Sequence, residues 1–479
     1  MTDTTSESIE TPCFSPDKSR AHELCLAASE VVAVDPAQAA QKLVDALQLQ
    51  PSNMLAYHLL AELYQSSGRD SEAQLCRRSI LPEPALRLLR TCHSVLVDIA
   101  ADHDTGAVVT DRQELFATEL TALPRPGGVP GGESFRPALF NEESIKAGPC
   151  FIDHIAGGKI WHDSFHTQVF NSQQQQVPEH TKADLPLIDA LIDQHQPYPV
   201  EGRLFVIGAR GAHNFYHWMA DIAPKLAVLL QAGYTFTTHD RFMVAFADAN
   251  FTRQILAQFG VAAEQVYESE KQSTYVTADE LVVPFVDNKM GLTMGSWLPP
   301  AMCRYFLPGA IPAGQTAGQT ADETSGKMPA TGALRLFIAR EPGASDGRRI
   351  ENQAELVSFL AQYGFECIRP EKLTVQQQAD LFSRAEIIVA AHGAALANIM
   401  FCSRGTRVIE FYSGHMAPCY WAVSALCGLE YAHVYCGRNR GSGNGRSENM
   451  TVPLSDVEVL FSNWFDSPDT RSSNLSVAG

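Results

Sequence analysis

Several features that would assign a class at once are scarce in this sequence. Its 479 residues hold 36 lysines and arginines against 54 aspartates and glutamates, and the net charge is -18. Non-specific nucleic-acid binding needs a basic surface, so the acidic balance argues against that function. No stretch reaches about 18 consecutive apolar residues, and we therefore expect no transmembrane helix.

Paired cysteines and an export signal are also missing. The 11 cysteines are odd in number and scattered, with no Cys-x-x-Cys pair. This usage is typical of reduced thiols rather than of a disulfide framework or a zinc site. The opening stretch MTDTTSESIETPCFSPDKSR has no basic region followed by an apolar run, so we expect no secretory signal. These absences predict a cytoplasmic protein, with peripheral association with the inner membrane left open.

The composition itself is globular. It is 45% hydrophobic and 19% charged, enough for sizeable cores, and the length favours about three domains. Changes in pattern along the chain predict six segments: a disordered tail over 1–18, a helical segment over 19–90, an α/β domain over 91–308, a linker over 309–332, a second α/β domain over 333–466 and a disordered tail over 467–479.

The helical segment over 19–90 has a spacing typical of tetratricopeptide repeats. Ala39 and Ala73 are 34 residues apart, the period of that repeat. Two repeats are too few for a free-standing solenoid. Two interpretations therefore stay open: a helical bundle packed on the rest of the chain, or a module that binds a partner protein or a second copy. For residues 90–200 we expect irregular β structure against the next domain.

Strands alternate with helices from Arg203 to about Pro284 and again from Leu334 to about Cys436. This alternation is typical of parallel sheets with helical crossovers, so each part predicts a doubly wound, Rossmann-like domain. Within the first part, residues 214–231 are predicted to form one helix, and within the second part residues 394–401 form another.

A phosphate-binding pattern stands in the second α/β part. The apolar strand ending at Ala391 stops at His392-Gly393, and small residues from Ala394 open the next helix. Such a turn lets a backbone approach a phosphate, with helix N–H groups directed at it. Glu410 ends the following strand, so it is expected at the same sheet edge.

Arginines and a histidine–carboxylate pair supply candidate chemistry. Arg340 ends a predicted strand, and Arg348 and Arg349 follow in a Gly/Pro loop; guanidinium groups suit bidentate contacts with phosphate. In NFYHWMADIAPKL, His217 and Asp221 are four apart and share a helix face. Either could accept a proton from a hydroxyl, although an isolated pair of this kind is a weak signal.

These motifs carry a family resemblance. The strings HGAALANIMF and GTRVIEF, preceded by AREPGASDGRRIENQAEL and further upstream by NFYHWMADIAPKL, resemble glycosyltransferase family 61 over roughly residues 200–440. The resemblance implies a GT-B architecture, with two Rossmann-like domains facing each other across a cleft. We expect a bacterial member with tetratricopeptide-like helices at its N-terminus.

The resemblance also implies an activity. It predicts an inverting, metal-independent transferase that moves a sugar from a nucleotide sugar, expected to be a UDP-sugar, to a glycan or protein hydroxyl, in a setting such as capsular or exopolysaccharide synthesis. Asp221 is the first candidate for the base and His217 the second. The expected donor site comprises Arg340, Arg348, Arg349, His392, Gly393, Ala394, Asn398 and Glu410, and the expected acceptor side comprises Asn214, Tyr216 and Trp218.

Metal and cofactor signals are weak. Asp102-His103-Asp104 is one formal Asp-x-Asp match, but a hairpin turn explains it equally, and His415, His433 and Cys436 form no convincing ligand set. We therefore predict no metal and no cofactor beyond the donor. Two alternatives stay open: a non-catalytic scaffold with a degenerate transferase domain, and a dinucleotide-dependent oxidoreductase, for which GARGAHNF is a near miss of the glycine fingerprint.

Overall fold

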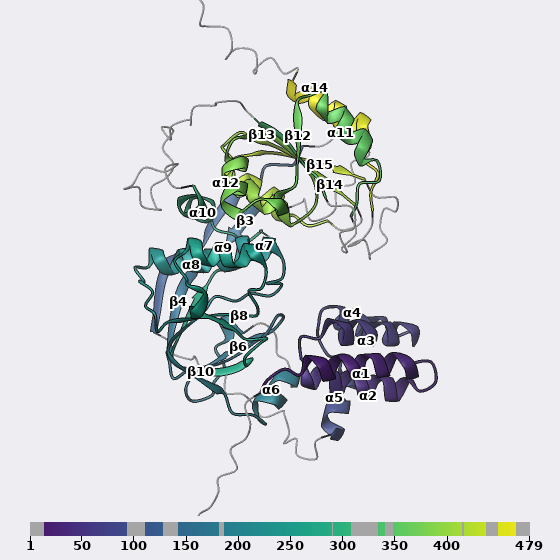
Figure 1. Ribbon diagram of the computed structural model, residues 1–479, viewed down its shortest axis with the longest axis vertical. Coiled ribbons are helices and arrows are strands. Elements are labelled where there is room, and N and C mark those ends of the chain that lie inside the picture. The colour runs from purple at the N-terminus through teal and green to yellow at the C-terminus, as the bar shows by residue number, and fades with distance from the viewer. Residues whose placement is uncertain are drawn as a thin grey trace, which may run out of the picture.

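The structure is a computed structural model that describes residues 14–92, 111–127, 142–181, 186–289, 291–307, 334–340, 348–413, 416–436 and 449–465. Most of both expected tails, the linker over 309–332, Asp102, Asp104 and His415 lie outside these ranges. The described chain forms an N-terminal helical segment and two sheets. The second sheet lies above the first along the long axis of the molecule (Figure 1). Among the described residues, no helix is both long and apolar enough to span a membrane.

The N-terminal segment is helical, as predicted. It contains α1 (Lys18–Val31), α2 (Pro36–Leu49), α3 (Met54–Ser66), α4 (Asp70–Arg77) and α5 (Glu83–Cys92). The side chains of Asp17, Asp35 and Asn53 accept hydrogen bonds from main-chain N–H groups at the starts of α1, α2 and α3, which satisfies donors that a helix start leaves unpaired. Ala39 and Ala73 are fully buried. Whether the segment belongs to the tetratricopeptide family stays a prediction.

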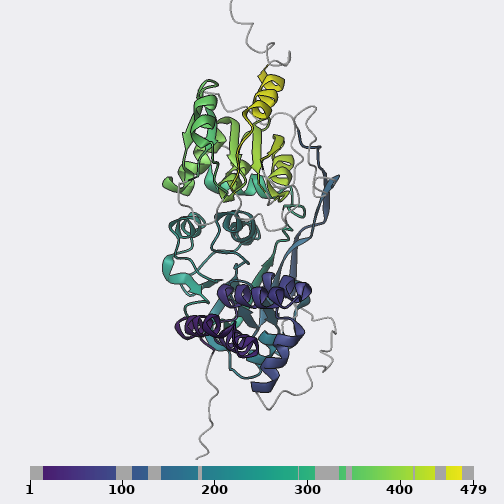
Figure 2. The same cartoon turned by 90° about the vertical axis from the view of Figure 1, so that its right-hand side faces the viewer.

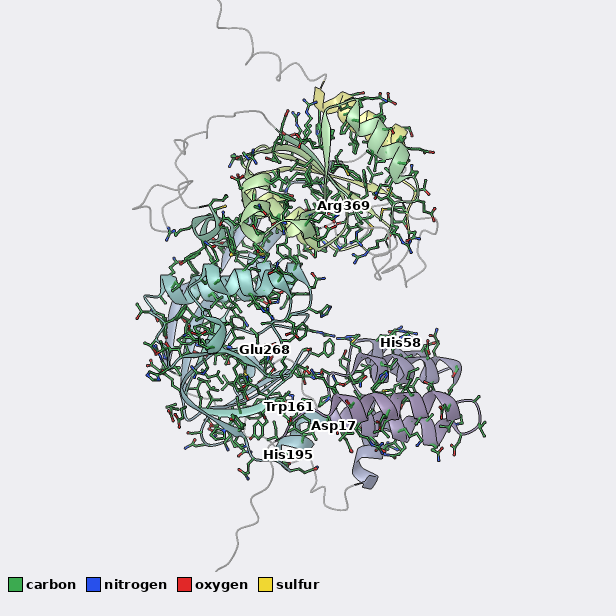
Figure 3. The ribbon with its side chains drawn as sticks, viewed as in Figure 1. Asp17, His58, Trp161, His195, Glu268 and Arg369 are labelled. Carbon is green, nitrogen blue, oxygen red and sulfur yellow. The ribbon has the colours of Figure 1, made fainter. Side chains whose placement is uncertain are left out.

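This helical segment shares a hydrophobic core with the first sheet. Trp161, Phe170 and Tyr275 from the sheet, and Leu187 and Ile188 from α6 (Pro186–Ile192), pack among the buried residues of the helices. Figure 2 shows the helices lying against the first sheet, and Figure 3 labels Asp17, Trp161 and His195 along the seam. Of the two interpretations of this segment, the structure therefore favours a bundle packed on the rest of the chain.

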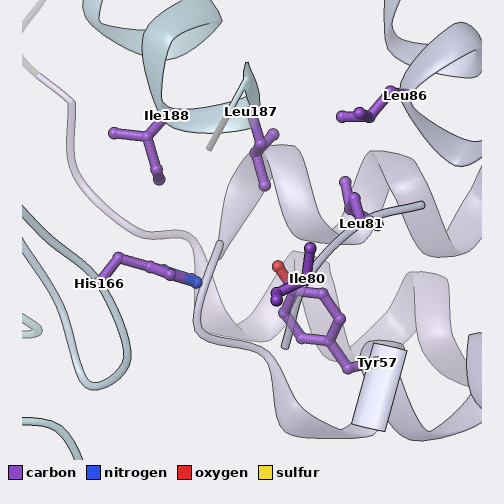
Figure 4. A pocket seen from close by; sticks show the side chains of 7 residues that line it. All are labelled: Tyr57, Ile80, Leu81, Leu86, His166, Leu187 and Ile188. Carbon is purple, nitrogen blue, oxygen red and sulfur yellow. The ribbon is translucent and has the colours of Figure 1, made fainter. Parts of the chain in front are cut away.

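Polar contacts cross the same seam. The Ser52 hydroxyl donates to a Glu270 carboxylate oxygen at 2.6 Å, and Lys18 forms an ion pair with the other oxygen at 3.4 Å. A cavity of about 10 Å³ remains between the helices and the sheet, lined by Tyr57, Ile80, Leu81, Leu86, His166, Leu187 and Ile188 (Figure 4). That volume holds about one water molecule, so it is a packing defect and not a ligand site.

The first sheet is mixed, which differs from the doubly wound sheet predicted for residues 91–308. Its order is β1-β4-β10-β7-β8-β9, with β5 paired to β10 and β6 paired to β5. Only β10, β7, β8 and β9 are parallel. The strands before β7 add antiparallel pairs: β1 with β4, β4 and β5 with β10, and the β5–β6 hairpin. The bounds are β1 (Asp111–Phe116), β4 (Cys150–Ala156), β5 (Lys159–His162), β6 (Thr167–Phe170), β7 (Tyr198–Val206), β8 (Arg241–Val244), β9 (Val266–Glu268) and β10 (Tyr275–Phe285).

Residues 90–200 are therefore more regular than expected where they are described. They also form a separate two-stranded sheet of β2 (Glu119–Ala122) and β3 (Ser144–Ala147). The helix predicted over 214–231 is present but is not α-helical throughout. It runs as α7 (Phe215–His217), a π-helical turn η3 (Trp218–Ile222) and α8 (Ala223–Gln231), and it is followed by α9 (Asn250–Gln258) and α10 (Leu298–Phe306).

The second sheet is fully parallel and doubly wound, as predicted. Its order is β12-β11-β13-β14-β15. The strands are β11 (Leu334–Ile338), β12 (Phe365–Ile368), β13 (Ala385–Ala391), β14 (Arg407–Tyr412) and β15 (Glu430–Tyr435). The helices are α11 (Gln353–Ala361), α12 (Val375–Ser383), α13 (Cys419–Cys427) and α14 (Leu454–Phe465), and residues Ala394–Phe401 form a 3-10 helix, η6, in place of the expected α-helix.

Helices cover both faces of the second sheet. Residues of α11 and α14 pack on one face with Phe337, Val389 and Ile409. On the other face, α12, η6 and α13 join a core that also contains residues of α8, α9 and α10 from the first sheet. The two sheets are thus connected by a continuous layer of packed helices.

Candidate active site

The strand order of each parallel region reverses at one point, and the candidate residues gather there. In the second sheet the reversal lies between β11 and β13. Arg340 follows β11, His392 follows β13, and an Arg340 Nη2 donates to the His392 carbonyl at 3.0 Å. In the first sheet the reversal lies between β7 and β10. Open α/β sheets bind ligands outside the carboxyl ends of their strands at such reversals.

The helix after β7 carries the histidine–aspartate pair. His217 Nδ1 lies 2.7 Å from Asp221 Oδ2, and the two side chains are 37% and 19% exposed. A second Asp221 oxygen accepts from the Asn288 amide at 2.9 Å. Because a carboxylate only accepts, His217 Nδ1 donates in this hydrogen bond, and in the neutral imidazole Nε2 is the acceptor atom. Both Asp221 oxygens therefore accept hydrogen bonds.

The expected acceptor-side residues have different roles. Asn214 caps the helix, since its side chain accepts from the Tyr216 N–H at 2.9 Å. Trp218 is fully buried, and its indole N–H donates to the Ala212 carbonyl at 2.6 Å, so it anchors the helix and has no surface for an acceptor. Tyr216 points toward the second sheet, since its ring centroid lies 5.8 Å from that of Tyr420.

Gly211 leaves room for His217. A Cβ on Gly211 would lie 2.5 Å from His217 Cδ2 and 2.8 Å from Nε2, and the backbone φ is +78°. L-residues rarely adopt that φ. The glycine is therefore required both by its own conformation and by the position of the imidazole.

A second histidine–carboxylate pair joins His392, which follows β13, to Glu410, which lies within β14 near its end. His392 Nδ1 lies 2.5 Å from Glu410 Oε1, and the side chains are 8% and 0% exposed. Glu410 Oε2 accepts from the Tyr412 hydroxyl at 2.9 Å and from the Tyr431 hydroxyl at 2.5 Å. Burial, followed by the charge of Glu410, raises the pKa of both phenols well above the ordinary value, so both remain proton donors.

Arginines meet at the carbonyl of His392. Besides Arg340, an Arg348 Nη1 donates to this oxygen at 3.4 Å. A Cβ on Gly393 would lie 2.4 Å from Arg340 Nη2, so this glycine makes room for the guanidinium. Arg349 is exposed, and its main-chain N–H donates to the Asn449 side chain at 3.1 Å. This contact does not place the Arg349 guanidinium beside those of Arg340 and Arg348.

Two further donor-site candidates lie along η6. Ala394 is its half-exposed first residue. Asn398 is fully buried and donates to Gln378 at 2.8 Å and to the Ala395 carbonyl at 3.0 Å. Asn398 thus joins η6 to α12 and lies inside the core rather than on a ligand surface.

Tyr420, at the start of α13, brings the two clusters together. Its ring centroid is 5.8 Å from that of Tyr216 and 5.4 Å from that of His392. Burial raises the pKa of Tyr420, and so do Cys419, Tyr216 and Glu410, whereas Arg348 lowers it. The Tyr420 ring therefore lies between Tyr216 of the first cluster and His392 of the second.

Sequence reasoning missed Tyr420 and Asn288. Asn288 follows β10 directly, and Tyr420 lies in the first turn of the helix after β14. Their positions after strands were the available signal, because carboxyl ends of parallel strands meet at one edge. Neither residue stands in a recognisable motif.

Among the described residues, no group of three or more histidine, cysteine, aspartate or glutamate side chains could hold a metal ion. His433 and Cys436 are both buried near the end of β15, and burial raises the pKa of the Cys436 thiol.

Comparison with known proteins gives the site its class. Residues 215–409 match the family model described as Glycosyltransferase 61. The match begins at the helix that carries His217 and Asp221 and ends one residue before Glu410. No curated protein matches the chain. Over residues 215–409 the chain is therefore similar to glycosyltransferase family 61, and this match supports a glycosyltransferase.

Proposed function

We propose that this protein is an inverting, metal-independent transferase that moves a sugar from a UDP-sugar to a hydroxyl of a glycan or protein acceptor. Tyr420 supports this most directly, since its ring contacts both Tyr216 and His392. An arginine cluster and a histidine–aspartate pair are thereby held at one place, as a single displacement requires. We propose that the two sheets work as the two halves of a GT-B enzyme.

The second sheet would bind the donor. Arg340 and Arg348 converge on one carbonyl at 3.0 and 3.4 Å, and guanidinium groups match the diphosphate that leaves with the nucleotide. Negative charge grows on that diphosphate as the bond to the sugar breaks, and fixed cations stabilise it. Main-chain N–H groups at the start of η6, beyond Gly393, would add to this stabilisation.

The first sheet would activate the acceptor. The acceptor oxygen attacks the anomeric carbon, the bond from that carbon to the diphosphate oxygen breaks, and the hydroxyl proton passes to a base. The sequence placed Asp221 first for this role. The geometry favours His217 Nε2, because both Asp221 oxygens accept hydrogen bonds from His217 and Asn288. Asp221 then holds the imidazole in the tautomer that can accept a proton.

The dinucleotide alternative receives no support from the loop after β7. Lys225 Nζ donates to the Gly208 carbonyl at 2.6 Å, and the His217 ring lies against Gly211. Side chains of the chain itself therefore occupy the space beside these glycines, where a pyrophosphate would have to approach.

Calorimetric titration of the full chain with UDP, GDP, CDP and ADP tests the donor class. We expect UDP to bind most tightly and UMP to bind less tightly than UDP. Failure of every nucleoside diphosphate to bind would overturn the proposal. Transfer assays with and without EDTA test metal independence, and collapse of activity in EDTA would direct attention to Asp102 and Asp104. Magnetic resonance of the product distinguishes inversion from retention at the anomeric carbon.

A further inference from the structure

Glu410 is the most completely enclosed charged group of the site. It is 0% exposed, within a parallel strand whose both faces are covered. Isolating a carboxylate from water is costly unless several donors satisfy it. Here His392 and Tyr431 donate to its two oxygens, and the Tyr412 hydroxyl lies within hydrogen-bond distance both of Oε2 at 2.9 Å and of the Ala417 carbonyl at 2.7 Å. A ribose hydroxyl would have to displace one of these donors to reach Glu410, so a role other than direct contact with the donor ribose fits this carboxylate better.

The residue that Glu410 holds is itself fixed on several sides. The His392 ring stacks on Tyr412 at a centroid distance of 5.2 Å and contacts Tyr420 at 5.4 Å. Its main-chain N–H donates to the Phe411 carbonyl at 2.8 Å. The position of the His392 carbonyl is therefore tied both to the ring and to β14.

That carbonyl is where the donor-site arginines meet. Arg340 and Arg348 both donate to it, and Gly393 next to it lies against the Arg340 guanidinium. Movement of the His392 ring would move the peptide between His392 and Gly393, and the guanidinium groups with it. We propose that Glu410 is a positioning residue that acts through His392 to place Arg340 and Arg348 for the donor diphosphate.

This inference rests on the proposed function, since it takes the arginines as the diphosphate site. Its test compares three probes in calorimetry: UDP, 2′-deoxy-UDP and inorganic pyrophosphate. With Glu410→Gln, we expect affinity for all three to fall by the same factor, about tenfold, the scale of one charge-assisted hydrogen bond. Pyrophosphate has no ribose, so an effect on it must come through the phosphate site.

A direct ribose contact predicts a different pattern. In that case Glu410→Gln would leave pyrophosphate binding unchanged and would abolish the discrimination between UDP and 2′-deoxy-UDP, and the inference would be overturned. Glu430→Gln is the matched control, because Glu430 begins the next strand and is 53% exposed beside Arg407. It should leave all three affinities unchanged.

A double-mutant cycle separates positioning from a general loss of structure. Once Arg340→Ala is present, Glu410→Gln should change UDP affinity far less than tenfold, because the two residues act on one element. Independent, multiplying effects would overturn the inference while the proposed function stands. If the wild-type chain binds none of the probes, or Arg340→Ala is without effect, the proposed donor site itself fails.

Tyr431→Phe keeps the proposal testable should Glu410→Gln not fold. It removes the hydroxyl that donates to Glu410 Oε2 at 2.5 Å and keeps the ring. We expect the same pattern across the three probes with a smaller loss. A pattern confined to the two ribose-containing probes would count against positioning.

Discussion

The two strand-end clusters each contain a histidine bound through Nδ1 to a carboxylate, yet they differ in exposure. The pair of the first sheet, His217 and Asp221, is 37% and 19% exposed, whereas His392 and Glu410 are 8% and 0% exposed. The partners of the carboxylates differ as well: an asparagine amide assists Asp221, and two tyrosine hydroxyls assist Glu410.

This difference separates two uses of one constellation. A group that exchanges protons with an acceptor must reach it, and the first pair is open enough to do so. A group that holds a backbone in place gains from exclusion of water, since buried hydrogen bonds are electrostatically stronger. Under the proposed function, this difference suits the pair of the first sheet to proton transfer and the pair of the second sheet to positioning the donor site.

The largest effect should follow loss of the exposed imidazole. His217→Gln keeps polarity but removes the base, so turnover should fall by about 10²–10⁴-fold with UDP affinity retained. Initial rates of transfer and calorimetry measure the two quantities. The matched control is His213→Gln, four residues earlier and also exposed, which should leave turnover near the wild-type value.

Asp221→Asn decides between the two candidates for the base. If His217 accepts the proton, the variant loses turnover through a misplaced tautomer, and His217→Gln loses at least as much. Asp221 would be the base if His217→Gln retained near-full transfer while Asp221→Asn lost about 10²–10⁴-fold. That outcome would overturn the role of His217 as the base, because the histidine would then only orient the Asp221 carboxylate.

Removal of the guanidinium that meets His392 should affect binding instead. Arg340→Ala should weaken UDP binding by roughly 1.5–3 kcal/mol, the scale of a charge-assisted hydrogen bond. Arg335→Ala is the control, because Arg335 lies near the start of β11, whereas Arg340 follows its end. The Arg335 side chain donates to the Tyr363 carbonyl at 2.7 Å. Equal UDP affinity of the Arg340 variant and the wild type would place the diphosphate elsewhere.

The second sheet could be predicted well from the sequence, and the first could not. In the second sheet, buried parallel strands contain continuous apolar runs such as residues 387–391, a strong local signal. The antiparallel strands of 111–170 are short and joined by polar turns, and their pairing with β10 depends on long-range contacts that no local pattern contains. The sequence therefore predicts strands and helices where the local hydrophobic pattern determines them, and it misses strand pairings that depend on distant residues.

The same limit applies to the site. Motifs pointed to His217, Asp221, Arg340 and His392, and the structure pairs His217 with Asp221 and Arg340 with His392. The sequence could not show that Glu410 is enclosed, because the enclosure comes from Tyr431 on a later strand. Nor could it show that Asn398 points into the core. Burial is a property of the packed chain, so a residue type at a strand end does not determine it.

Glycine substitutions sharpen the comparison at an intermediate size. Gly211→Ala strains a backbone at φ +78° and presses on His217, so turnover should fall by about tenfold or more with UDP affinity retained. Gly393→Ala meets only the end of the Arg340 side chain, so we expect UDP affinity to fall by a few-fold with a smaller change in kcat. Steady-state kinetics and calorimetry distinguish the two, and an exchange of these effects would reverse the assignment.

A third histidine–carboxylate pair, His166 and Asp163, has no role in the proposed reaction and serves as the reference. His166 Nδ1 lies 3.0 Å from Asp163 Oδ2, both side chains are buried, and His166 borders the cavity at the seam with the N-terminal helices. Asp163→Asn should therefore leave transfer unchanged and lower the free energy of unfolding by roughly 1–3 kcal/mol, the cost of weakening a buried, charge-assisted hydrogen bond. A loss of turnover in folded protein would extend the active site to this seam.

The pH dependence of that stability follows from the two pKa shifts. Burial alone would raise the pKa of Asp163, but His166 and hydrogen bonds outweigh it and lower this pKa below its ordinary value of 3.8. Burial alone would lower the pKa of His166, but Asp163 and the Ser79 carbonyl raise it above 6.5 despite Arg210. The contribution of Asp163 is thus present above pH 3.8 and lost on acidification, and that of His166 is present below pH 6.5 and lost as the pH rises through its raised pKa. Denaturant unfolding across pH should show the largest gap between wild type and Asp163→Asn within this window, and a gap independent of pH would mean that the pair is not an ion pair.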